Sequence, residues 1–279
     1  MSNRGRLYVV ATPIGNLDDL SVRAQKTLAE VDCIAVEDTR HSAQMLSRFG
    51  IQKPLISVHE HNERDRSAGL VDRLRGGEAI ALISDAGTPL ISDPGFILVR
   101  AAREAGITVS PIPGPSAAIA ALSVAGLPSD RFFFEGFLPH KTGARQKRLH
   151  ELAGETATLI FYESPHRIEG ALADMAAIFG EGRQATLARE LTKIHETIID
   201  GSLELLARIV TDDPNQRRGE IVLVVAGHSP DVLGMTPEAE RVLKLLLQEL
   251  PVKKAARLAS EVTGVSRNLL YDLALHSRD

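Results

Sequence analysis

The chain has 279 residues, which exceeds one domain of ordinary size, so we expect two domains that each bury a core. Apolar residues make up 44% of it and charged residues 24%, proportions that are typical of globular proteins and exclude a disordered chain. The net charge of −4 argues against a protein that coats nucleic acid indiscriminately, but it leaves room for a local basic face.

The sequence carries no signal for a membrane segment, a disulfide or a metal site. The longest apolar runs, such as residues 221–226, are too short to span a bilayer, and residues 1–11 lack the apolar stretch of a signal peptide. Cys33 is the single cysteine, and no Cys/His grouping resembles a zinc site. We therefore expect a cytoplasmic protein with no membrane association and no metal.

Short apolar or β-branched runs recur along the chain and predict strands. Several are apolar throughout, as is typical of strands covered on both faces in a parallel sheet. The runs between them have helical patterns, at 22–31, 40–49 and 117–125, with capping residues before them or glycine after them. This alternation predicts an α/β fold with right-handed crossovers. The predicted strands are 7–11, 33–37, 56–58, 79–84, 108–112, 132–134, 158–162, 185–189, 196–199 and 221–225.

Two candidate domain boundaries divide the predicted strands and helices. Prolines and glycines between 111 and 128 interrupt the chain, after which strands and helices alternate afresh. A polar stretch with glycine and proline at 227–237 follows the last strand, and only helical pattern comes after it. We expect an N-terminal α/β domain at 1–115, a C-terminal α/β domain at 116–230 and a helical tail at 237–279.

Three loops rich in glycine and proline follow predicted strands of the first domain, at 11–17, 84–95 and 112–117. Ligands of open α/β sheets bind beyond the carboxyl ends of the strands. Any one of these loops could be a simple tight turn, but three in one domain indicate a ligand site. The usual glycine signatures of dinucleotide and triphosphate sites are absent from the sequence.

Seven motifs occur in order along the chain: TPIGNLDDLS (12–21), AVEDTRHS (35–42), SDAGTPLISDPG (84–95), PIPGPSA (111–117), FYESPHR (161–167), ARELTKIHE (188–196) and GEIVLVVAG (219–227). Over residues 7–227 the chain resembles the tetrapyrrole methylase superfamily, and within it the members that methylate RNA. The resemblance implies 2′-O-methylation of a cytidine ribose in the decoding region of 16S ribosomal RNA, within the small ribosomal subunit. It also implies S-adenosylmethionine as the methyl donor and a homodimer.

In this superfamily the cofactor lies in a cleft between two α/β domains, and the resemblance implies the same cleft here. Relatives that act on tetrapyrroles commonly read Gly-Asp-Pro where this chain has Gly87-Thr88-Pro89, and Asp85 is the nearby candidate for that carboxylate contact. The residues that the motifs assign to the cofactor are Pro13, Ile14, Asp85, Gly87, Thr88, Ile91, Ser116, Ala117 and Tyr162.

A ribose hydroxyl is a poor nucleophile, so a base that accepts its proton would help the transfer. Glu37 or Asp38, at the end of the second predicted strand, is our candidate, with Arg40 orienting the base or a phosphate. The alternative for Asp38 is a helix N-cap. Two further groups compete for the role, each with a structural alternative as a cap or an ion pair. They are Glu163, His166 and Arg167, and Arg189, Glu190 and Lys193.

Two basic features suit RNA. The run at 140–150 carries Lys141, Arg145, Lys147 and Arg148 and no acid, and we assign these residues and Lys193 to RNA phosphates. A solvated helix face is the alternative. In the tail, 252–262 and 266–275 read as two helices of a helix-turn-helix, with a plain helical hairpin as the alternative.

Two other functions compete with RNA methylation. A tetrapyrrole (precorrin) C-methyltransferase would account for the loops alone, and it predicts an aromatic-rich cleft in a chain with only 4% aromatic residues. A non-catalytic helix-turn-helix regulator would account for the tail alone. An RNA methyltransferase accounts for the loops, the basic run and the tail together.

Overall fold

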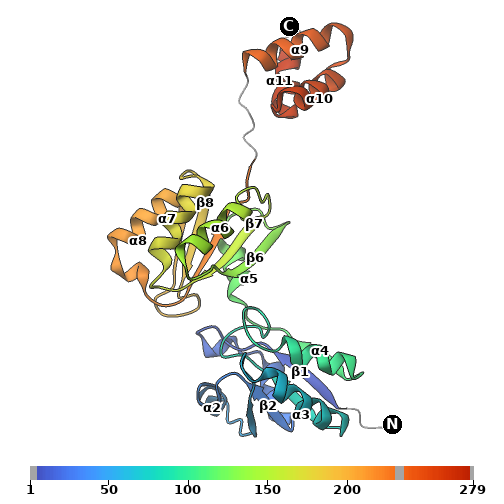
Figure 1. Ribbon diagram of the computed structural model, residues 1–279, viewed down its shortest axis with the longest axis vertical. Helices are drawn as coiled ribbons and strands as arrows, with labels where there is room; N and C mark the ends of the chain where they lie inside the picture. The colour runs from blue at the N-terminus through green and yellow to red at the C-terminus, as the bar shows by residue number, and fades with distance from the viewer. Residues whose placement is uncertain (1–4, 230–235, 277–279) are drawn as a thin grey trace. The chain divides into compact units, whose positions relative to one another are not determined.

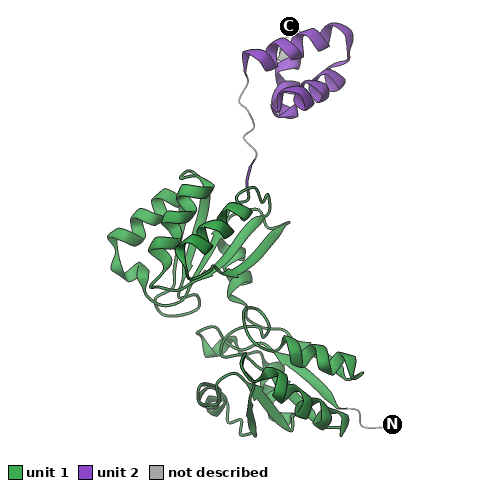
Figure 2. Ribbon diagram, in the orientation of Figure 1, with its two compact units in different colours: residues 1–227 green, residues 228–279 purple. Residues whose placement is uncertain are grey.

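A computed structural model describes residues 5–229 and 236–276 of the chain. Its contacts divide the chain into two compact units, residues 1–227 and 228–279 (Figure 2). The first unit holds two five-stranded sheets, one in its N-terminal half and one in its C-terminal half, and the second unit holds three helices. The expected α/β class with a helical tail is confirmed, whereas the boundary near residue 115 stays a prediction.

The sheet of the N-terminal half is parallel throughout, in the order β3-β2-β4-β1-β5. Side chains alternate across it, so Ile34 and Val36 face the helices α1 and α2 while Cys33 and Ala35 face α3 and α4. Both faces are therefore covered. The bounds are β1 Arg6–Val10, β2 Cys33–Val36, β3 Leu55–Ser57, β4 Ala79–Leu82, β5 Thr108–Ile112, α1 Val22–Glu30, α2 Thr39–Arg48, α3 Glu63–Arg75 and α4 Phe96–Glu104.

The sheet of the C-terminal half has the order β6-β7-β10-β8-β9, and α6, α7 and α8 lie on one of its faces (Figure 1). The helix α5 packs on the other face, against Ile160, Val222 and Val224. The bounds are α5 Ala117–Val124, β6 Phe132–Phe137, α6 Thr142–Leu152, β7 Thr158–Glu163, α7 Ile168–Phe179, β8 Gln184–Arg189, β9 Thr197–Ser202, α8 Leu203–Asp212 and β10 Ile221–Val225.

The expectation of parallel strands is wrong for most of this second sheet. The strands β6 and β7 are parallel, but the pairs β7–β10, β10–β8 and β8–β9 are antiparallel. The apolar pattern could not reveal this, because β10 is buried on both faces whichever way its neighbours run. The short loop 190–196 allows an antiparallel turn between β8 and β9, whereas a parallel pair would need a longer crossover.

The second unit is built from α9 (Pro237–Glu249), α10 (Val252–Thr263) and α11 (Arg267–His276). They enclose a small core of their own that contains Leu243 and Leu270, with Ala255, Ala256 and Ala259 lining one face of α10. Gly264, in the left-handed conformation with φ 73°, ends α10 and lets the chain turn toward α11. Within the described ranges, no helix is both long and apolar enough to cross a membrane.

Candidate active site

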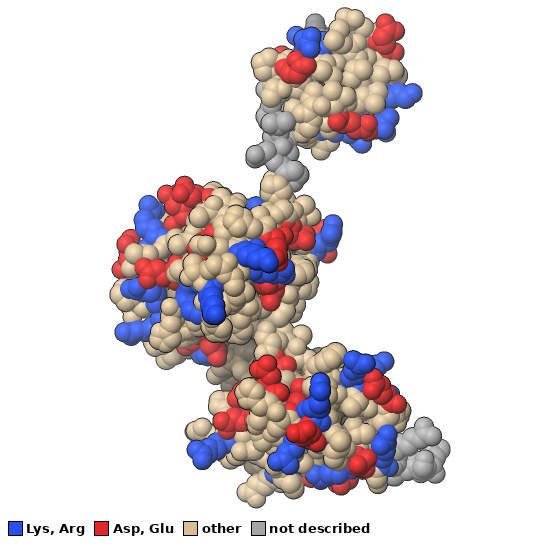
Figure 3. Space-filling view, in the orientation of Figure 1, with Lys and Arg blue, Asp and Glu red and all other residues tan. Residues whose placement is uncertain are grey.

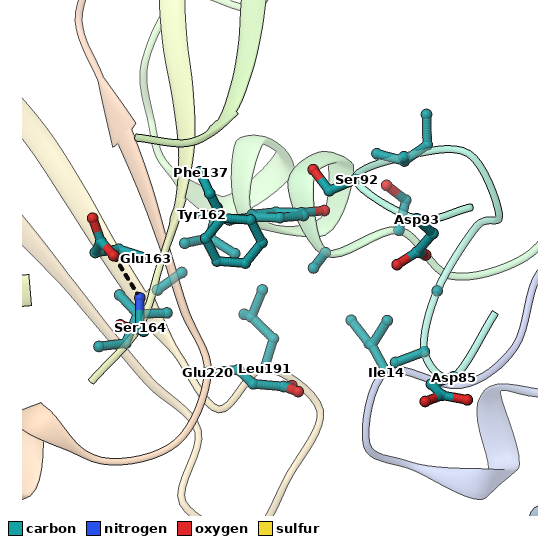
Figure 4. Close-up of a pocket in the computed structure, with 18 of the residues that line it drawn as sticks. Ile14, Asp85, Ser92, Asp93, Phe137, Tyr162, Glu163, Ser164, Leu191 and Glu220 are labelled. Carbon is teal, nitrogen blue, oxygen red and sulfur yellow. Dashed lines mark hydrogen bonds between the residues drawn. The ribbon is translucent and has the colours of Figure 1, made fainter. Parts of the chain in front are cut away.

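A cavity of about 450 Å³ lies between the N-terminal and C-terminal halves of the first unit (Figure 4). We call it the central cavity. Loops at the carboxyl ends of parallel strands line it from one side, through Ile14, Asp85 and Asp93. Tyr162, at the end of β7, and Leu191, after β8, line it from the other side. The central cavity therefore lies beyond the carboxyl ends of parallel strands, where open α/β sheets bind ligands.

Hydrogen bonds tie the three loops of the N-terminal half together. The backbone N–H of Thr12 donates to Gly87 O at 2.8 Å, and the N–H of Gly87 returns a bond to Thr12 O at 3.1 Å. The hydroxyl of Thr88 donates to the carbonyl of Pro115 at 2.9 Å, which links the second loop to the third. Gly87 has φ 84°, a conformation that side chains disfavour. The loops thus form one connected wall.

Tyr162 anchors the opposite wall. Its hydroxyl accepts a hydrogen bond from the backbone N–H of Ala118 at 3.2 Å, at the start of α5. Phe134 and Phe137 pack edge-on against its ring, with centroids 5.0 and 5.6 Å away. In Figure 4 the phenol points across the cavity toward Ser92 and Asp93. Burial raises the pKa of Tyr162, so the phenol stays neutral at physiological pH.

The charge of the central cavity is one-sided. Its described lining residues include no Lys, Arg or His, whereas five of them are carboxylates. Glu163 is paired with Arg167 and Glu220 with Lys193, so the other three carboxylates give the lining the negative charge that attracts a cation and repels a polyphosphate. The five carboxylates are Glu37, Asp85, Asp93, Glu163 and Glu220.

Three of these carboxylates form an acidic cluster, Glu37, Asp85 and Asp93. Burial raises the pKa of Asp93 to about 6; a hydrogen bond from Ser84 opposes the shift, and the charges of Glu37 and Asp85 add to it. Burial also raises the pKa of Glu37, again helped by Asp85. Burial, with a smaller contribution from the neighbouring negative charges, therefore keeps a proton on Asp93 and Glu37 at higher pH than on isolated carboxyls.

The sequence analysis assigns no role to Asp93, although this residue lies in the motif at 84–95. The loop 84–95 carries a carboxylate near each end, Asp85 and Asp93, with glycines and prolines between and beside them. Leu90 and Ser92 adopt positive φ angles of 74° and 63°, which non-glycine residues rarely do. Such strain concentrates at functional sites and persists only where the surroundings impose it. The paired acids were the available signal; the strain was visible only in the structure.

The candidates for the proton acceptor occupy different environments in the structure. Glu37 lines the central cavity, whereas Asp38 and Arg40 do not. The carboxylate of Asp38 accepts from the backbone N–H groups of Arg40 and His41 at 2.7 and 3.2 Å, so it is the N-cap of α2. These bonds lower the pKa of Asp38, which weakens it as a proton acceptor. Asp38 therefore has the structural role of a helix N-cap, which was the alternative to a role as proton acceptor.

The two competing groups are mainly structural. Glu163 is buried, accepts from the N–H of Ser164 at 2.8 Å and pairs with Arg167 at 3.3 Å. Arg167 also donates to the carbonyl of Leu138 at 2.6 Å, and His166 is exposed. Burial raises the pKa of Glu163. Only Glu163 of these residues lines the central cavity.

In the other group, the guanidinium of Arg189 donates to Thr197 Oγ1 at 2.9 Å and to His195 O at 3.1 Å. The ammonium of Lys193 lies 2.7 Å from Glu190 and 3.0 Å from Glu220. These bonds hold the loop between β8 and β9.

The structure brings together the residues that the resemblance assigns to the cofactor. All of them except Pro13 line the central cavity, and Pro13 lines a neighbouring one. Lining residues that the sequence reasoning did not name include Ser92, Asp93, Leu191, Glu220 and Val222. The last three lie on or beside strands of the antiparallel part of the second sheet, where the parallel interpretation gave no reason to place them at a site.

Two of the four cations in the basic run are engaged in salt bridges within the protein. Arg145 is buried and its Nε donates to Asp174 at 2.6 Å, so it is not available to RNA. Arg148 pairs with Glu135 at 2.7 Å and with Glu151 at 2.8 Å. Lys141 and Lys147 are exposed, and no salt bridge involves them in the part of the chain that the structure describes. On the faces seen in Figure 3, basic and acidic side chains are interspersed.

The tail is a three-helix unit rather than a two-helix hairpin, because α9 packs with α10 and α11 around their shared core. Lys253, Lys254, Arg257 and Arg267 are exposed. Arg257 pairs with Glu261 at 3.1 Å. No group of His, Cys, Asp or Glu in residues 5–229 or 236–276 is arranged to hold a metal ion.

The model of the family described as tetrapyrrole (corrin/porphyrin) methylases matches residues 6–207. The chain belongs to this family. A ribosomal RNA small subunit methyltransferase I from Xylella fastidiosa is 57% identical, covering 97% of this chain and 99% of its own. The protein of that name from Pseudomonas aeruginosa is 59% identical, covering 97% of each chain.

The tail and the fold match known proteins as well. The model described as the RsmI C-terminal HTH domain matches residues 234–278. Diphthine synthase has a TM-score of 0.59 at 18% identity, covering 80% of this chain and 91% of its own. A uroporphyrin-III C-methyl transferase from Thermus thermophilus, complexed with S-adenosyl homocysteine, has a TM-score of 0.55 at 17% identity, covering 80% and 97%. These two likenesses show the shared fold.

Proposed function

We propose that this methyltransferase transfers a methyl group from S-adenosylmethionine to the 2′-oxygen of a cytidine ribose in the decoding region of 16S ribosomal RNA. The observation that carries the proposal is the central cavity, whose described charged lining residues are all carboxylates. The relatives named for methylation of small-subunit ribosomal RNA, which match nearly the whole chain, support the substrate class.

The residues of the cavity fit this cofactor. S-adenosylmethionine carries a sulfonium, an ammonium and one carboxylate, so it is a net cation that an acidic lining attracts. The apolar side chains of Ile14, Leu191 and Val222 suit the flat face of an adenine, and Gly87 leaves its backbone open to close approach. A volume of about 450 Å³ is in the ordinary range for nucleoside-sized ligands.

When bound, the cofactor supplies an electrophilic methyl group. The protein contributes alignment, because the loops that surround the cavity are held to one another by backbone and threonine hydrogen bonds. Fixing two reactants in an attack geometry can supply roughly 7–11 kcal/mol of the barrier. Ordered loops, rather than a nucleophile on the protein, are therefore its largest contribution.

The acidic cluster supplies the proton acceptor for the ribose hydroxyl. Glu37 and Asp93 both line the cavity, and a carboxylate whose pKa is about 6, as at Asp93, is matched to catalysis near neutral pH. General-base assistance of this kind contributes about 10²–10⁴-fold. Asp38 is set aside, because its carboxylate is committed to the start of α2.

The proposal is tested by incubating the purified protein with methyl-labelled S-adenosylmethionine and, in parallel reactions, either small ribosomal subunits from cells that lack this modification or a precorrin. We expect label in 16S ribosomal RNA on one ribose 2′-oxygen, and mapping by primer extension identifies the cytidine. Label that goes only into a precorrin would support the alternative tetrapyrrole function. Absence of label from RNA, with cofactor bound, would overturn the proposal.

Two accompanying proposals follow. A ribosomal RNA substrate places the enzyme in the cytoplasm, where small subunits reside. Family resemblance favours a homodimer, and light scattering during size-exclusion chromatography measures it directly. A mass that corresponds to one chain of 30.1 kDa at micromolar concentration would contradict the dimer.

A further inference from the structure

A second cavity of about 560 Å³ adjoins the central cavity. We call it the side cavity. The two share Ile14, Asp85, Ala86 and Glu220 in their linings, so they are neighbours across a common wall. The side cavity is lined by the loop after β1, by one face of α2 and by Lys193; the residues from the loop and the helix are Pro13, Ile14, Gly15, Leu17, His41, Gln44, Met45 and Arg48.

Helix geometry produces the face that α2 turns to the side cavity. Positions 41, 44, 45 and 48 follow the i, i+3, i+4, i+7 spacing that places side chains on one side of a helix. Ser42 and Leu46 point elsewhere and are buried. The face that results carries polar or cationic ends at His41, Gln44 and Arg48, with the half-buried Met45 between them.

The side cavity differs from the central cavity in charge. Its lining includes the cations of Arg48 and Lys193, whereas the described lining of the central cavity has none. Lys193 is already held by Glu190 and Glu220, and its aliphatic stem supports the first loop, because a Cβ at Gly15 would lie 2.4 Å from Lys193 Cγ. Arg48 is exposed, and in the described part of the chain no salt bridge engages it.

We infer that the side cavity receives the target nucleotide of the RNA, with Arg48 contacting a backbone phosphate. This inference rests on the proposed function. An unpaired guanidinium offers two parallel donors to phosphate oxygens, and the apolar surface of Leu17 and Met45 is available to a base that is turned out of its stack. The ribose 2′-oxygen of that nucleotide would then approach the methyl group of the cofactor at the boundary between the two cavities.

The test compares Arg48→Gln and Arg48→Glu with a matched control, Arg103→Gln. Arg103 also lies exposed in the last turn of a helix, α4, and it is absent from the lining of both cavities. RNA affinity is measured on small subunits or a decoding-region RNA fragment at several salt concentrations. Cofactor affinity is measured separately by calorimetry.

We expect Arg48→Gln to weaken RNA binding about 3- to 10-fold and to reduce the slope of log Kd against log salt by about 0.7, as loss of one phosphate contact requires. Arg48→Glu should weaken binding further. Cofactor affinity should stay within about 2-fold for each variant, since Arg48 is outside the central cavity.

A second variant tests the space rather than the charge. Gln44 is exposed on α2, so Gln44→Trp leaves the core intact while it fills the side cavity. We expect RNA methylation to fall at least about 10-fold with unchanged cofactor binding. If the Arg48 variants match Arg103→Gln and Gln44→Trp methylates RNA normally, the inference is wrong. If the wild type fails to methylate small-subunit RNA at all, the proposed function fails instead.

Discussion

Gly87 lies where the loop after β4 crosses the loop after β1, and its backbone is bonded to Thr12 in both directions. A Cβ at this position would lie 3.4 Å from Ile14 Cγ2, and φ is 84°. A larger side chain must therefore either displace Ile14 or extend into the central cavity. The need for glycine here comes from both the backbone conformation and the space that a ligand would use.

We predict that Gly87→Leu lowers the affinity for S-adenosylmethionine at least about 100-fold, because the new side chain occupies the cavity. Gly106→Leu is the matched control: Gly106 has φ 71°, but nothing lies within 4 Å of its Cβ position. Both variants incur about 1–2 kcal/mol of backbone strain. Equal calorimetric affinities in the two folded variants would refute the placement of the cofactor.

Asp93 gives a pH dependence that can be measured without any substrate. Its pKa is about 6 in the folded protein, above the ordinary value of 3.8, so the folded state holds this proton more tightly than the unfolded chain does. The resulting stabilisation is fully present below pH 4 and is lost as the pH rises through about 6. Above that pH, the ionised carboxylate destabilises the fold.

Asp93→Asn removes this titration. We predict that it raises the free energy of unfolding at pH 7.5 by roughly 1–3 kcal/mol relative to wild type, and that the difference shrinks toward zero at pH 4. Urea unfolding at the two pH values measures it. The exposed control Asp200→Asn should change stability by less than about 0.5 kcal/mol at either pH. A gain of the same size at pH 4 would contradict the assignment.

At the scale of elements, α6 shows why the cations of a basic run are not all available to bind RNA. Two of the four cations are held by carboxylates of the protein: Arg145 pairs with Asp174, and Arg148 pairs with Glu135 and Glu151. Arg145 points inward to Asp174 on α7, and Gln146 donates a second hydrogen bond to the same carboxylate at 2.9 Å. The pair joins two helices that cover the second sheet.

We predict that Arg145→Ala lowers the free energy of unfolding by about 3 kcal/mol, because it leaves the carboxylate of Asp174 nearly buried without its partner. Lys147→Ala, at an exposed position on the same helix, should cost less than about 0.5 kcal/mol. The double variant Arg145→Met/Asp174→Leu should recover most of the loss. A stable Arg145→Ala protein with weakened RNA binding would restore Arg145 to the RNA contacts.

At the scale of the whole molecule, the division into two compact units has a functional consequence. The described residues that line the central and side cavities all belong to the first unit. The second unit encloses its own core of leucines and alanines. Cofactor binding and RNA engagement should therefore be separable by truncation.

We predict that a chain ending at residue 236 unfolds cooperatively and binds S-adenosylmethionine with an affinity within about 2-fold of the full chain. Its binding to small-subunit RNA should weaken about 10-fold or more, because the exposed cations of α10 and α11 are lost. Calorimetry and filter binding measure the two affinities. Full RNA methylation by the truncated chain would show that the tail has no role in recognition.

The sequence by itself determined where most strands and helices lie. Periodicity, caps and glycines act within a few residues, so they can be read locally: Ser21 caps α1 through a bond from Ala24 N–H, and Gly50 turns left-handed at φ 66° after α2. The Gly/Pro loops also predicted a ligand site at the carboxyl ends of the first sheet's strands. Residue identity at motif positions supplied the family.

Only the tertiary structure decided which residues share the site and in what protonation state. Strand direction in the second sheet, the cap role of Asp38 and the inward turn of Arg145 all depend on neighbours that are distant in the sequence. Asp93 is the plainest case. Its raised pKa arises because folding buries it beside Glu37 and Asp85, and the electrostatic cost of bringing these charges together appears only when the chain has closed around them.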